Sequence, residues 1–275
     1  LAYTFMSSRG SIIEGKYRQL IDRKITGDEF IDSTFELESQ YLFKDDITKL
    51  SRWLINTSTE LEISNNIHLS ARFNRVSDKN YFKEIVHTNT DADRIKSHLK
   101  VSYKNPKKNL SANLLTEDEQ IVNDGSPSYT RALEGSIYKT FNAEGDLPFQ
   151  AGLITTQFSH DDASKDSGTR IHGTLGTSKT ISRKFPKITT GADVSTTYYS
   201  LDMKDNITRT TVGAGIDFTF PFISQRELFN AQVTRTITPK ISYNYRGKVV
   251  QGNIPIFDTT DKYDDAITFA ELTSG

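Results

Sequence analysis

Hydrophobic and polar residues alternate along most of this chain with a period of two, as in a strand whose two faces meet different surroundings. The alternation is clearest over residues 207–220. Apolar side chains there occupy every second position, at Val212, Ala214, Ile216 and Phe218. The positions between them are small or polar, at Thr211, Gly213, Gly215 and Asp217. This stretch predicts a β-strand with one apolar face and one polar face.

Similar alternation recurs in roughly thirteen segments, most of about 10–14 residues, against about 5–6 residues for a usual globular strand. The segments lie near residues 1–6, 11–20, 31–43, 50–63, 66–77, 95–105, 109–120, 130–142, 147–160, 169–182, 187–203, 207–220 and 230–246. No stretch keeps a 3.6-residue period over three turns. The chain is therefore predicted to be all β and antiparallel.

The connections between these segments alternate between short and long from about residue 63 to residue 187. The short ones are residues 64–66, 105–108, 143–146 and 183–186, and the long ones are residues 77–94, 121–129 and 161–168. Outer-membrane β-barrels have short periplasmic turns and longer outer loops, which would give this alternation. Two later connections break the rule, because residues 204–206 are short and residues 221–229 are long where the opposite is expected.

Composition limits the possible fold classes but does not decide between them. Hydrophobic residues make up 35% of the chain, which is low for a solid globular core, and no apolar run reaches the length of a membrane helix. The 34 basic and 35 acidic residues nearly balance, so the total charge gives no indication of a nucleic-acid partner. A transmembrane β-barrel fits best, while a soluble antiparallel sandwich or barrel stays open.

In a membrane barrel, one face of each strand meets lipid and the other meets a polar interior. The polar positions that we assign to the inner face are Glu36, Glu38, Arg72, Thr211 and Asp217. We interpret their charges as the wall of a hydrated lumen and not as an acid–base pair. Leu37, Phe73 and Ile216 lie in the alternate positions and are expected to face lipid.

Candidate chemistry is sparse. The chain has no cysteine, and no two of its five histidines have metal-ligand spacing. His160, Asp161 and Asp162 could begin a cation site, but they open a polar loop and are better interpreted as solvated. Glycines within the strand patterns indicate bends or close approach of the backbone; they are Gly173, Gly176, Gly213 and Gly215. On these residues alone an enzyme is possible but unsupported, and we expect no metal and no cofactor.

Two stretches resemble a known family. The first is Ser51-Arg52-Trp53, followed by a hairpin and then Arg75-Val76-Ser77-Asp78-Lys79-Asn80-Tyr81-Phe82. The second is Thr238-Pro239-Lys240-Ile241-Ser242-Tyr243, leading into Asn253-Ile254-Pro255-Ile256-Phe257-Asp258-Thr259. They are similar to the lipopolysaccharide-assembly outer-membrane family LptD, also called organic solvent tolerance proteins. Residues 7–10 and 269–275 are similar to it as well. The signature residues, interpreted as strand-end and loop determinants, are Ser51, Arg52, Trp53, Ser77, Asp78, Tyr81, Phe82, Pro239, Pro255, Phe257 and Asp258.

The resemblance implies a barrel of about 26 strands behind a periplasmic jelly-roll, in the outer membrane of a Gram-negative bacterium. Residues 1–275 would be an internal part of that barrel, with the jelly-roll, the family's disulfide cysteines and both terminal strands outside it. The implied partners are lipopolysaccharide, an LptE-type lipoprotein plug, periplasmic bridge proteins that act through the jelly-roll, and outer-membrane lipid. The resemblance implies transport and assembly of lipopolysaccharide at the outer membrane, with no catalytic residue and no enzymatic activity. A porin-like diffusion channel and a soluble β-rich binding or hydrolytic domain are the alternatives.

Overall fold

The computed structural model of the chain describes residues 1–24, 30–86, 93–123, 126, 128–142, 144, 147–182, 185–228, 231–247, 254–258 and 261. The described residues are almost entirely antiparallel β-sheet, so the predicted all-β class is confirmed. Their strands are β1 (Ala2–Met6), β2 (Gly10–Lys24), β3 (Phe30–Leu42), β4 (Arg52–Ser64), β5 (Ile67–Val76), β6 (Arg94–Asn105), β7 (Leu110–Ile121), β8 (Thr130–Phe141), β9 (Phe149–Ser159), β10 (Gly168–Ser182), β11 (Lys187–Leu201), β12 (Ile207–Thr219), β13 (Phe222–Leu228), β14 (Ala231–Ile237) and β15 (Lys240–Arg246).

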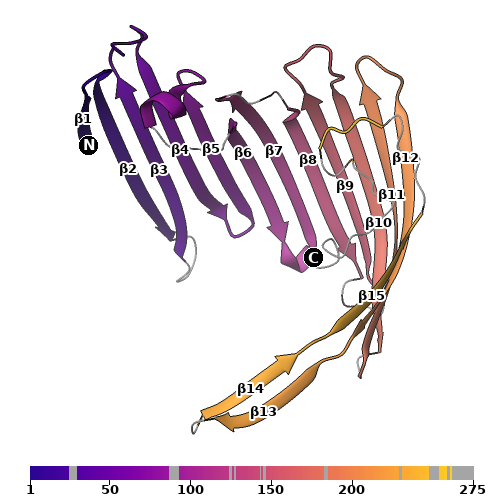
Figure 1. Cartoon of the computed structure of the whole chain (residues 1–275). Helices are drawn as coiled ribbons and strands as arrows, with labels where there is room; N and C mark the ends of the chain where they lie inside the picture. The colour runs from indigo at the N-terminus through magenta and orange to yellow at the C-terminus, as the bar shows by residue number, and fades with distance from the viewer. Residues whose placement is uncertain are drawn as a thin grey trace. The chain divides into compact units, whose positions relative to one another are not determined.

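Two short helices accompany the strands: a π-helix at Phe82–Val86 and a 3₁₀ helix at Pro106–Lys108. Across the described part of the chain, no helix is long and apolar enough to cross a membrane. Hydrogen-bonded strand order follows the chain from β1 to β12 and then passes to β15, while β13 and β14 pair with each other (Figure 1). This sequential order is that of an up-and-down antiparallel sheet.

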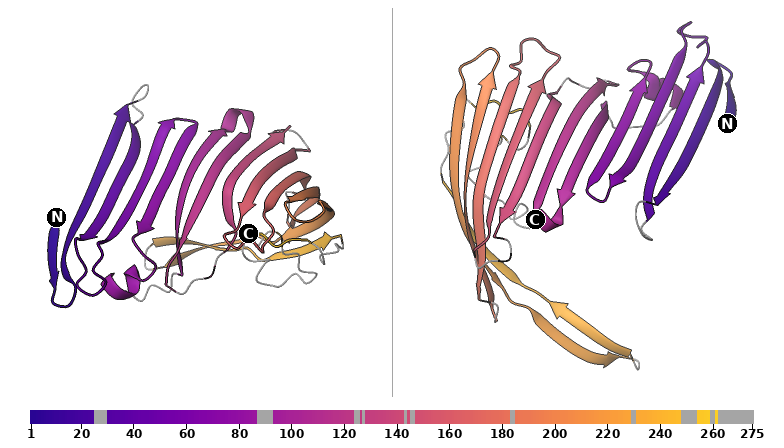
Figure 2. Two further views of the ribbon diagram at one scale, coloured as in Figure 1. Left: turned by 90° about the horizontal axis from the view of Figure 1, so that it is seen from above. Right: turned by 180° about the vertical axis from the view of Figure 1, so that it is seen from behind.

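The chain divides into two compact units. The first comprises Leu1–Ile137, Thr155–Thr169 and Leu201–Lys204; the second comprises Tyr138–Ile154, Arg170–Ser200 and Asp205–Gly275. In the first unit, β1 to β7 lie side by side in both views of Figure 2. In the second unit, β11, β12 and β15 are consecutive neighbours.

Strand pairing in the first unit places the predicted inner-face residues on one face. Residues opposite each other in an antiparallel pair share a face. One row crosses β2 to β6 through Arg18, Glu36, Ser58, Arg72 and His98. Glu38 lies two residues from Glu36 on β3 and so shares this polar face.

The opposite face of the first unit is apolar and exposed. The neighbouring row passes through Tyr17, Leu37, Thr57 and Phe73. Tyr17 and Phe73 are 53% and 48% exposed. An apolar sheet face that the described residues leave exposed favours an apolar surrounding such as a lipid bilayer.

The second unit repeats this division. On its apolar face, Ile216 lies between Thr190 of β11 and Tyr243 of β15. On its polar face, Asp217 lies between Thr189 and Ser242, and Thr211 lies opposite Ser195. The alternation in the sequence therefore corresponds to two chemically distinct sheet faces.

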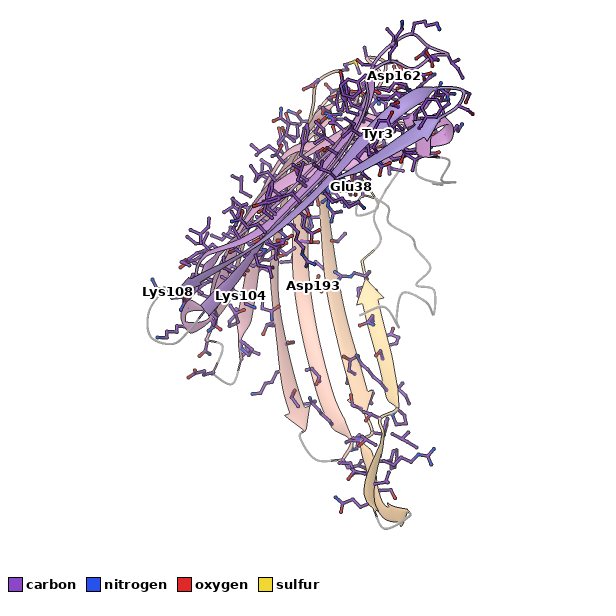
Figure 3. The ribbon with its side chains drawn as sticks, turned by 90° about the vertical axis from the view of Figure 1, so that its left-hand side faces the viewer. Tyr3, Glu38, Lys104, Lys108, Asp162 and Asp193 are labelled. Atoms are coloured by element: carbon purple, nitrogen blue, oxygen red, sulfur yellow. The ribbon has the colours of Figure 1, made fainter. Side chains whose placement is uncertain are left out.

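The short connections lie at one end of each unit's sheet, which we call the turn end, and the long connections lie at the loop end. In the first unit, Figure 3 places Lys104 and Lys108 at the turn end and Asp162 at the opposite end. The buried cluster of the first unit lies at the loop end and consists of Ile12, Leu42, Val76, Tyr81, Ile85 and Val122. Packing is thus concentrated where a long loop covers the polar face.

Two segments differ from the sequence prediction. Residues 221–229 were expected to be a connection, but Phe222–Leu228 forms β13 and pairs with β14. The single strand predicted over residues 230–246 is divided at Thr238 and Pro239 into β14 and β15. Proline lacks the N–H that continues a ladder, so the break falls there. The long connection on the turn side is therefore a hairpin with its own ladder.

Candidate functional site

Two of the inner-face residues predicted in the first unit, Glu36 and Glu38, form ion pairs with β2. Arg18 Nε lies 2.9 Å from Glu36 Oε1, and Lys16 Nζ lies 2.9 Å from Glu38 Oε1. The four side chains line a shallow groove of about 300 Å³ with Asn56 and Ser58. Exposed pairs of this kind contribute little to stability, so they make a hydrated polar wall and not a rigid binding pocket.

A larger groove of about 690 Å³ lies on the polar face of the second unit. Asp193 and Arg246 line it and form an ion pair that crosses β12 at Gly213. A Cβ added to Gly213 would lie 2.6 Å from Arg246 Nη1 and 2.7 Å from Asp193 Oδ1. Close approach is therefore the reason for glycine at this position, as the sequence pattern predicted.

Two predicted inner-face residues border the same polar surface. Asp217 Oδ2 lies 3.1 Å from Lys240 Nζ, and the hydroxyls of Ser195 and Thr211 are 2.5 Å apart. The hydroxyl, amide and paired charged side chains on this polar face, beside its glycines, can form hydrogen bonds with water or with a polar ligand. That these polar faces line a lumen stays a prediction.

The most tightly organised group in the first unit surrounds Arg52, the first residue of β4. Its guanidinium donates to both oxygens of Asp78, at 2.8 and 2.7 Å. Its Nη1 also donates to Glu84 Oε2 at 2.7 Å and to Asp45 Oδ2 at 3.2 Å. Arg9 Nη1 completes the group by donating to Asp45 Oδ2 at 2.6 Å. We call these five residues the Arg52 cluster; it connects the three loops that follow β1, β3 and β5 to the first residue of β4.

Asp45 is the fully buried carboxylate of this cluster. Burial acts to raise its pKa, but the backbone N–H of Ile47 and the guanidinium groups of Arg52 and Arg9 outweigh burial and lower the pKa to about 2. The carboxyl of Asp78 is also partly buried, and the hydrogen bonds from Arg52 and Ser77 lower its pKa. Both groups are therefore charged at neutral pH, so the cluster is held by ion pairs.

Tyr81 fixes the covering loop over the polar face. Its side chain is fully buried, and its hydroxyl donates to Gln40 Oε1 at 3.0 Å. The Arg52 guanidinium carbon lies 5.7 Å from the centre of the ring, and Phe82 packs against the ring edge-on. Burial is the main cause that raises the pKa of Tyr81 to about 12, so the phenol stays protonated.

A second organised group in the second unit surrounds Arg170 of β10. Arg170 Nη1 donates to Asp258 Oδ1 and to Asp261 Oδ1, both at 2.9 Å, and Nη2 donates to Asp258 Oδ2 at 3.1 Å. The hydroxyl of Tyr199 donates to Asp261 Oδ1 at 2.8 Å, and Arg209 Nη1 donates to the Asp261 carbonyl at 3.2 Å. We call these five residues the Arg170 cluster; it holds residues 254–258 and 261 against three strands.

Most predicted signature residues belong to these clusters or contact them. Arg52, Asp78 and Tyr81 meet in the first unit, and Asp258 belongs to the Arg170 cluster. Of the others, Phe82 packs on Tyr81, Ser77 Oγ donates to Asp78 Oδ2 at 2.8 Å, and buried Phe257 lies beside Tyr199 with ring centres 6.3 Å apart.

The remaining signature residues have simpler surroundings. Ser51 is exposed, and Trp53 lies opposite Tyr41 in the sheet. The Pro239 carbonyl accepts the Phe220 N–H at 2.9 Å, and Pro255 is half-buried. A structural role for the signature residues stays a prediction, and these contacts support it. Asn253, Thr259 and the similar stretch at 269–275 lie outside the described residues.

Sequence patterns missed several members of the two clusters. Asp45, Glu84, Arg170, Tyr199 and Asp261 look like ordinary loop or strand residues, because their burial depends on distant partners. The one available signal was position: Arg170 and Tyr199 lie at the loop ends of predicted strands, where covering loops attach.

The described residues contain no group of three or more histidine, cysteine or acidic side chains arranged to hold a metal. Asp162 lies in an exposed loop, where its N–H donates to His160 Nδ1 at 3.0 Å and its Oδ1 accepts the Ser164 N–H at 2.9 Å. These local bonds are those of a solvated turn.

The family model and the curated relatives that match this chain belong to one family. Residues 50–271 match the family model described as "LptD: LPS transport system D". The chain is 28% identical to the LPS-assembly protein LptD of Idiomarina loihiensis, over 96% of this chain and 35% of that protein. It is 26% identical to LPS-assembly protein LptD of Shewanella sp. strain MR-4, over 95% and 34% of the two chains. This chain therefore spans about a third of the length of these curated relatives.

Among solved structures, the chain is similar to OmpT, an outer membrane protein of Vibrio cholerae. The TM-score is 0.39 at 7% sequence identity, with 86% of this chain and 94% of that chain covered. A likeness of this degree carries no conclusion about function.

Proposed function

Because this chain belongs to the LptD family of LPS transport system D proteins, we propose that it forms part of the outer-membrane wall through which lipopolysaccharide reaches the cell surface. The family match over residues 50–271 is the observation that carries this proposal. The family and its named relatives place the chain in the Gram-negative outer membrane and among transport and assembly proteins, not enzymes.

The two sheet faces support the proposal physically. Exposed apolar residues such as Tyr17 and Phe73 suit contact with lipid acyl chains, while the rows through Glu36 and Asp217 suit a hydrated interior. A glycolipid has both an acyl part and a sugar-rich part. A wall with one face for each can keep acyl chains out of water while polar groups stay hydrated.

Partners are part of the same proposal. A lipoprotein plug of the LptE type would contact the polar face, periplasmic bridge proteins would deliver lipopolysaccharide, and outer-membrane lipid would surround the apolar face. Photo-crosslinkers at Glu38, Arg72 and Asp217 should capture the plug or lipopolysaccharide. Crosslinkers at Leu37, Phe73 and Ile216 should capture bulk lipid, and equal products from both sets would contradict the face assignment.

Depletion of the native protein tests the function itself. Newly made lipopolysaccharide should disappear from the cell surface, and hydrophobic antibiotics should enter more readily. A porin-like channel predicts a different result, namely unchanged surface lipopolysaccharide and reduced uptake of small polar solutes. That second result would replace the transport proposal by the channel alternative.

A further inference from the structure

Strands β5 and β6 are paired over only part of their length. Their backbone ladder extends from the turn end to the pair formed by Arg72 and His98. Both strands continue beyond this pair towards the loop end, as residues 73–76 of β5 and residues 94–97 of β6. In the described part of the chain, no backbone pair joins these two ranges. We call this region the β5–β6 seam.

Side chains replace the missing backbone bonds of the seam. Ser97 Oγ accepts the Asn74 N–H at 3.0 Å and donates to the Asn74 carbonyl at 3.2 Å. Gln120 of β7 serves Val76 in the same way, because its Oε1 accepts the Val76 N–H at 3.0 Å and its Nε2 donates to the Val76 carbonyl at 2.8 Å. A backbone group without a ladder partner must find another partner in a membrane wall. Two side chains therefore satisfy the edge of β5 that faces the seam.

The two sides of the seam are anchored to different neighbours. The end of β5 belongs to the β4 ladder, and the Ser77 N–H extends that pairing by donating to the Trp53 carbonyl at 2.9 Å. The start of β6 belongs to the β7 ladder, in which Arg94 lies opposite Ile121. Each side keeps its own ladder when the seam opens. Opening therefore breaks side-chain bonds but no strand pairing.

A few further contacts hold the seam closed. On the polar face, Ile95 of β6 packs against the buried cluster at the loop end. On the other face, Arg75 forms an ion pair with Asp118 of β7, whose side chain is 62% exposed, and an exposed pair of this kind contributes little. Beyond the strands, the Asn123 N–H donates to the Lys79 carbonyl at 2.7 Å. The closed seam thus depends mainly on apolar packing and on the side-chain bridges.

Asn74 has an unsatisfied hydrogen-bonding group in the closed seam. Its Nδ2 donates to the Lys96 carbonyl at 3.2 Å. Its Oδ1 is buried and has no hydrogen-bond partner within the described residues. Leaving a buried acceptor unpaired is unfavourable, and contact with water removes that penalty. The closed seam is therefore destabilised at the point where β5 and β6 separate.

We propose that the β5–β6 seam opens reversibly at the loop end and admits water between the two strands, while the turn-end half stays paired. The opening is a conformational device of the wall, because it lets the sheet widen at the loop end without loss of any ladder. By contrast, β6 and β7 are paired along their whole length, from Arg94 to Asn105 of β6. The inference concerns the movement of the wall and holds whichever solute the wall transports.

Hydrogen exchange at single-residue resolution tests the opening, because an amide exchanges only when water reaches it. Alternate N–H groups of a strand point to the same neighbour, so those of Ser70 and Arg72 face β6, as those of Asn74 and Val76 do. In the native full-length protein in detergent, Asn74 and Val76 should exchange at least tenfold faster than Ser70 and Arg72. Equal protection of the four amides would overturn the proposal.

Simple fraying of the strand end predicts a different order of exchange. Ser77 lies nearer the loop end than Asn74, but its N–H forms the backbone bond with Trp53 on the β4 side. If the seam opens while the β4 ladder persists, Ser77 should exchange at least tenfold more slowly than Asn74. Exchange that is faster at Ser77 than at Asn74 would assign the effect to fraying and overturn the seam.

Variants separate the bridges from the general stability of the sheet. Ser97→Ala removes the bridge to Asn74 and should raise exchange at Asn74 and Val76 at least threefold, whereas Ser97→Thr keeps a hydroxyl and should restore the original rate. The control Thr59→Val removes a hydroxyl that donates to the Thr34 carbonyl at 2.9 Å beside the intact β3–β4 ladder, and it should leave both rates unchanged. No change in Ser97→Ala, or an equal rise in the control, would overturn the proposal. Heat-modifiable migration in gels confirms that each variant is folded.

Discussion

The Arg52 cluster and the Arg170 cluster use the same chemistry at different sequence distances. Each has an almost fully buried arginine on a strand, a fully buried aspartate and a fully buried tyrosine near a guanidinium. Arg52 lies 7, 26 and 32 residues from Asp45, Asp78 and Glu84, whereas Arg170 reaches Asp258 and Asp261 across 88 and 91 residues. The bonds of Arg52 can therefore form between neighbouring hairpins, while those of Arg170 need a more distant part of the chain. Arg9 is the long-range member of the first cluster, because it also pairs with Glu84 at 3.1 Å.

The clusters also differ in what surrounds them. The first lies beside a buried apolar group that includes Leu42, Val76 and Ile85. The described part of the second has Phe257 and Tyr199 as its buried apolar partners. Buried ion pairs therefore attach loops in both units, while hydrophobic packing reinforces mainly the loops of the first unit.

The largest expected effect is that of Arg52→Ala. It leaves the buried Asp45 carboxylate with Arg9 as its remaining guanidinium partner, so the free energy of unfolding should fall by about 3–5 kcal/mol. Denaturant unfolding of the native protein in detergent measures this. Arg52→Lys should restore only part of the loss, since lysine cannot form the two parallel bonds to Asp78. A loss below about 1 kcal/mol would show that packing, and not the ion pairs, holds the loop.

Arg170→Ala should have the next largest effect, about 2–3 kcal/mol. Asp261 would still accept bonds from the Tyr199 hydroxyl and from the Phe257 N–H, which limits the loss. Hydrogen exchange should increase first at residues 254–258 and spare residues 77–86. Equal release of both segments would contradict the independence of the clusters.

Acid should break the ion pairs of the Arg52 cluster and lower the free energy of unfolding by on the order of 2 kcal/mol. The pKa of Asp45 is lowered in the folded protein to about 2, so its contribution is fully present above its unfolded pKa of about 4. That contribution is lost as the pH falls through about 2. Pepsin cleavage within residues 77–86 should rise over this interval in the native protein, and an onset near pH 6 would exclude Asp45 as the cause.

The smallest effect is expected outside the clusters. Glu36→Gln removes an exposed pair with Arg18 and should change the free energy of unfolding by about 0–1 kcal/mol. The same denaturant experiment supplies the measurement. A loss comparable to that of Arg52→Ala would show that polar-face pairs, and not only the buried clusters, hold the fold.

Much of the architecture was predictable from the two-residue period of the hydrophobic pattern and from the spacing of the predicted strands. Alternation placed the strands, and a row such as Glu36 to Arg72 confirms that polar positions on successive strands share a face. Family membership, the all-β antiparallel class and the outer-membrane location are confirmed. A closed barrel of about 26 strands and the status of residues 1–275 as an internal part of it stay predictions.

The clusters were predictable only in part. Arg52, Asp78 and Tyr81 stood out through a family resemblance, but nothing local indicated that Asp45 would be buried among them. Period-two patterns report which face a strand residue occupies and carry no information on which loop covers that face. Strand β13 was missed for a similar reason, because a seven-residue strand beside Pro221 looks like a connection.

The length of the β13–β14 hairpin determines how far the chain extends beyond the turn end of the sheet. Figure 1 shows β13 and β14 extending past the end of β12, and each has seven residues. At about 3.4 Å per residue they span about 24 Å, more than half the thickness of a bilayer's hydrocarbon core of about 30 Å. The connection lengths predict that the turn end faces the periplasm, so a ribbon of that length starting there is expected to extend beyond the headgroups into that compartment. A protease or an antibody confined to that compartment would then reach the β13–β14 hairpin, while lipid would shield β12 and β15.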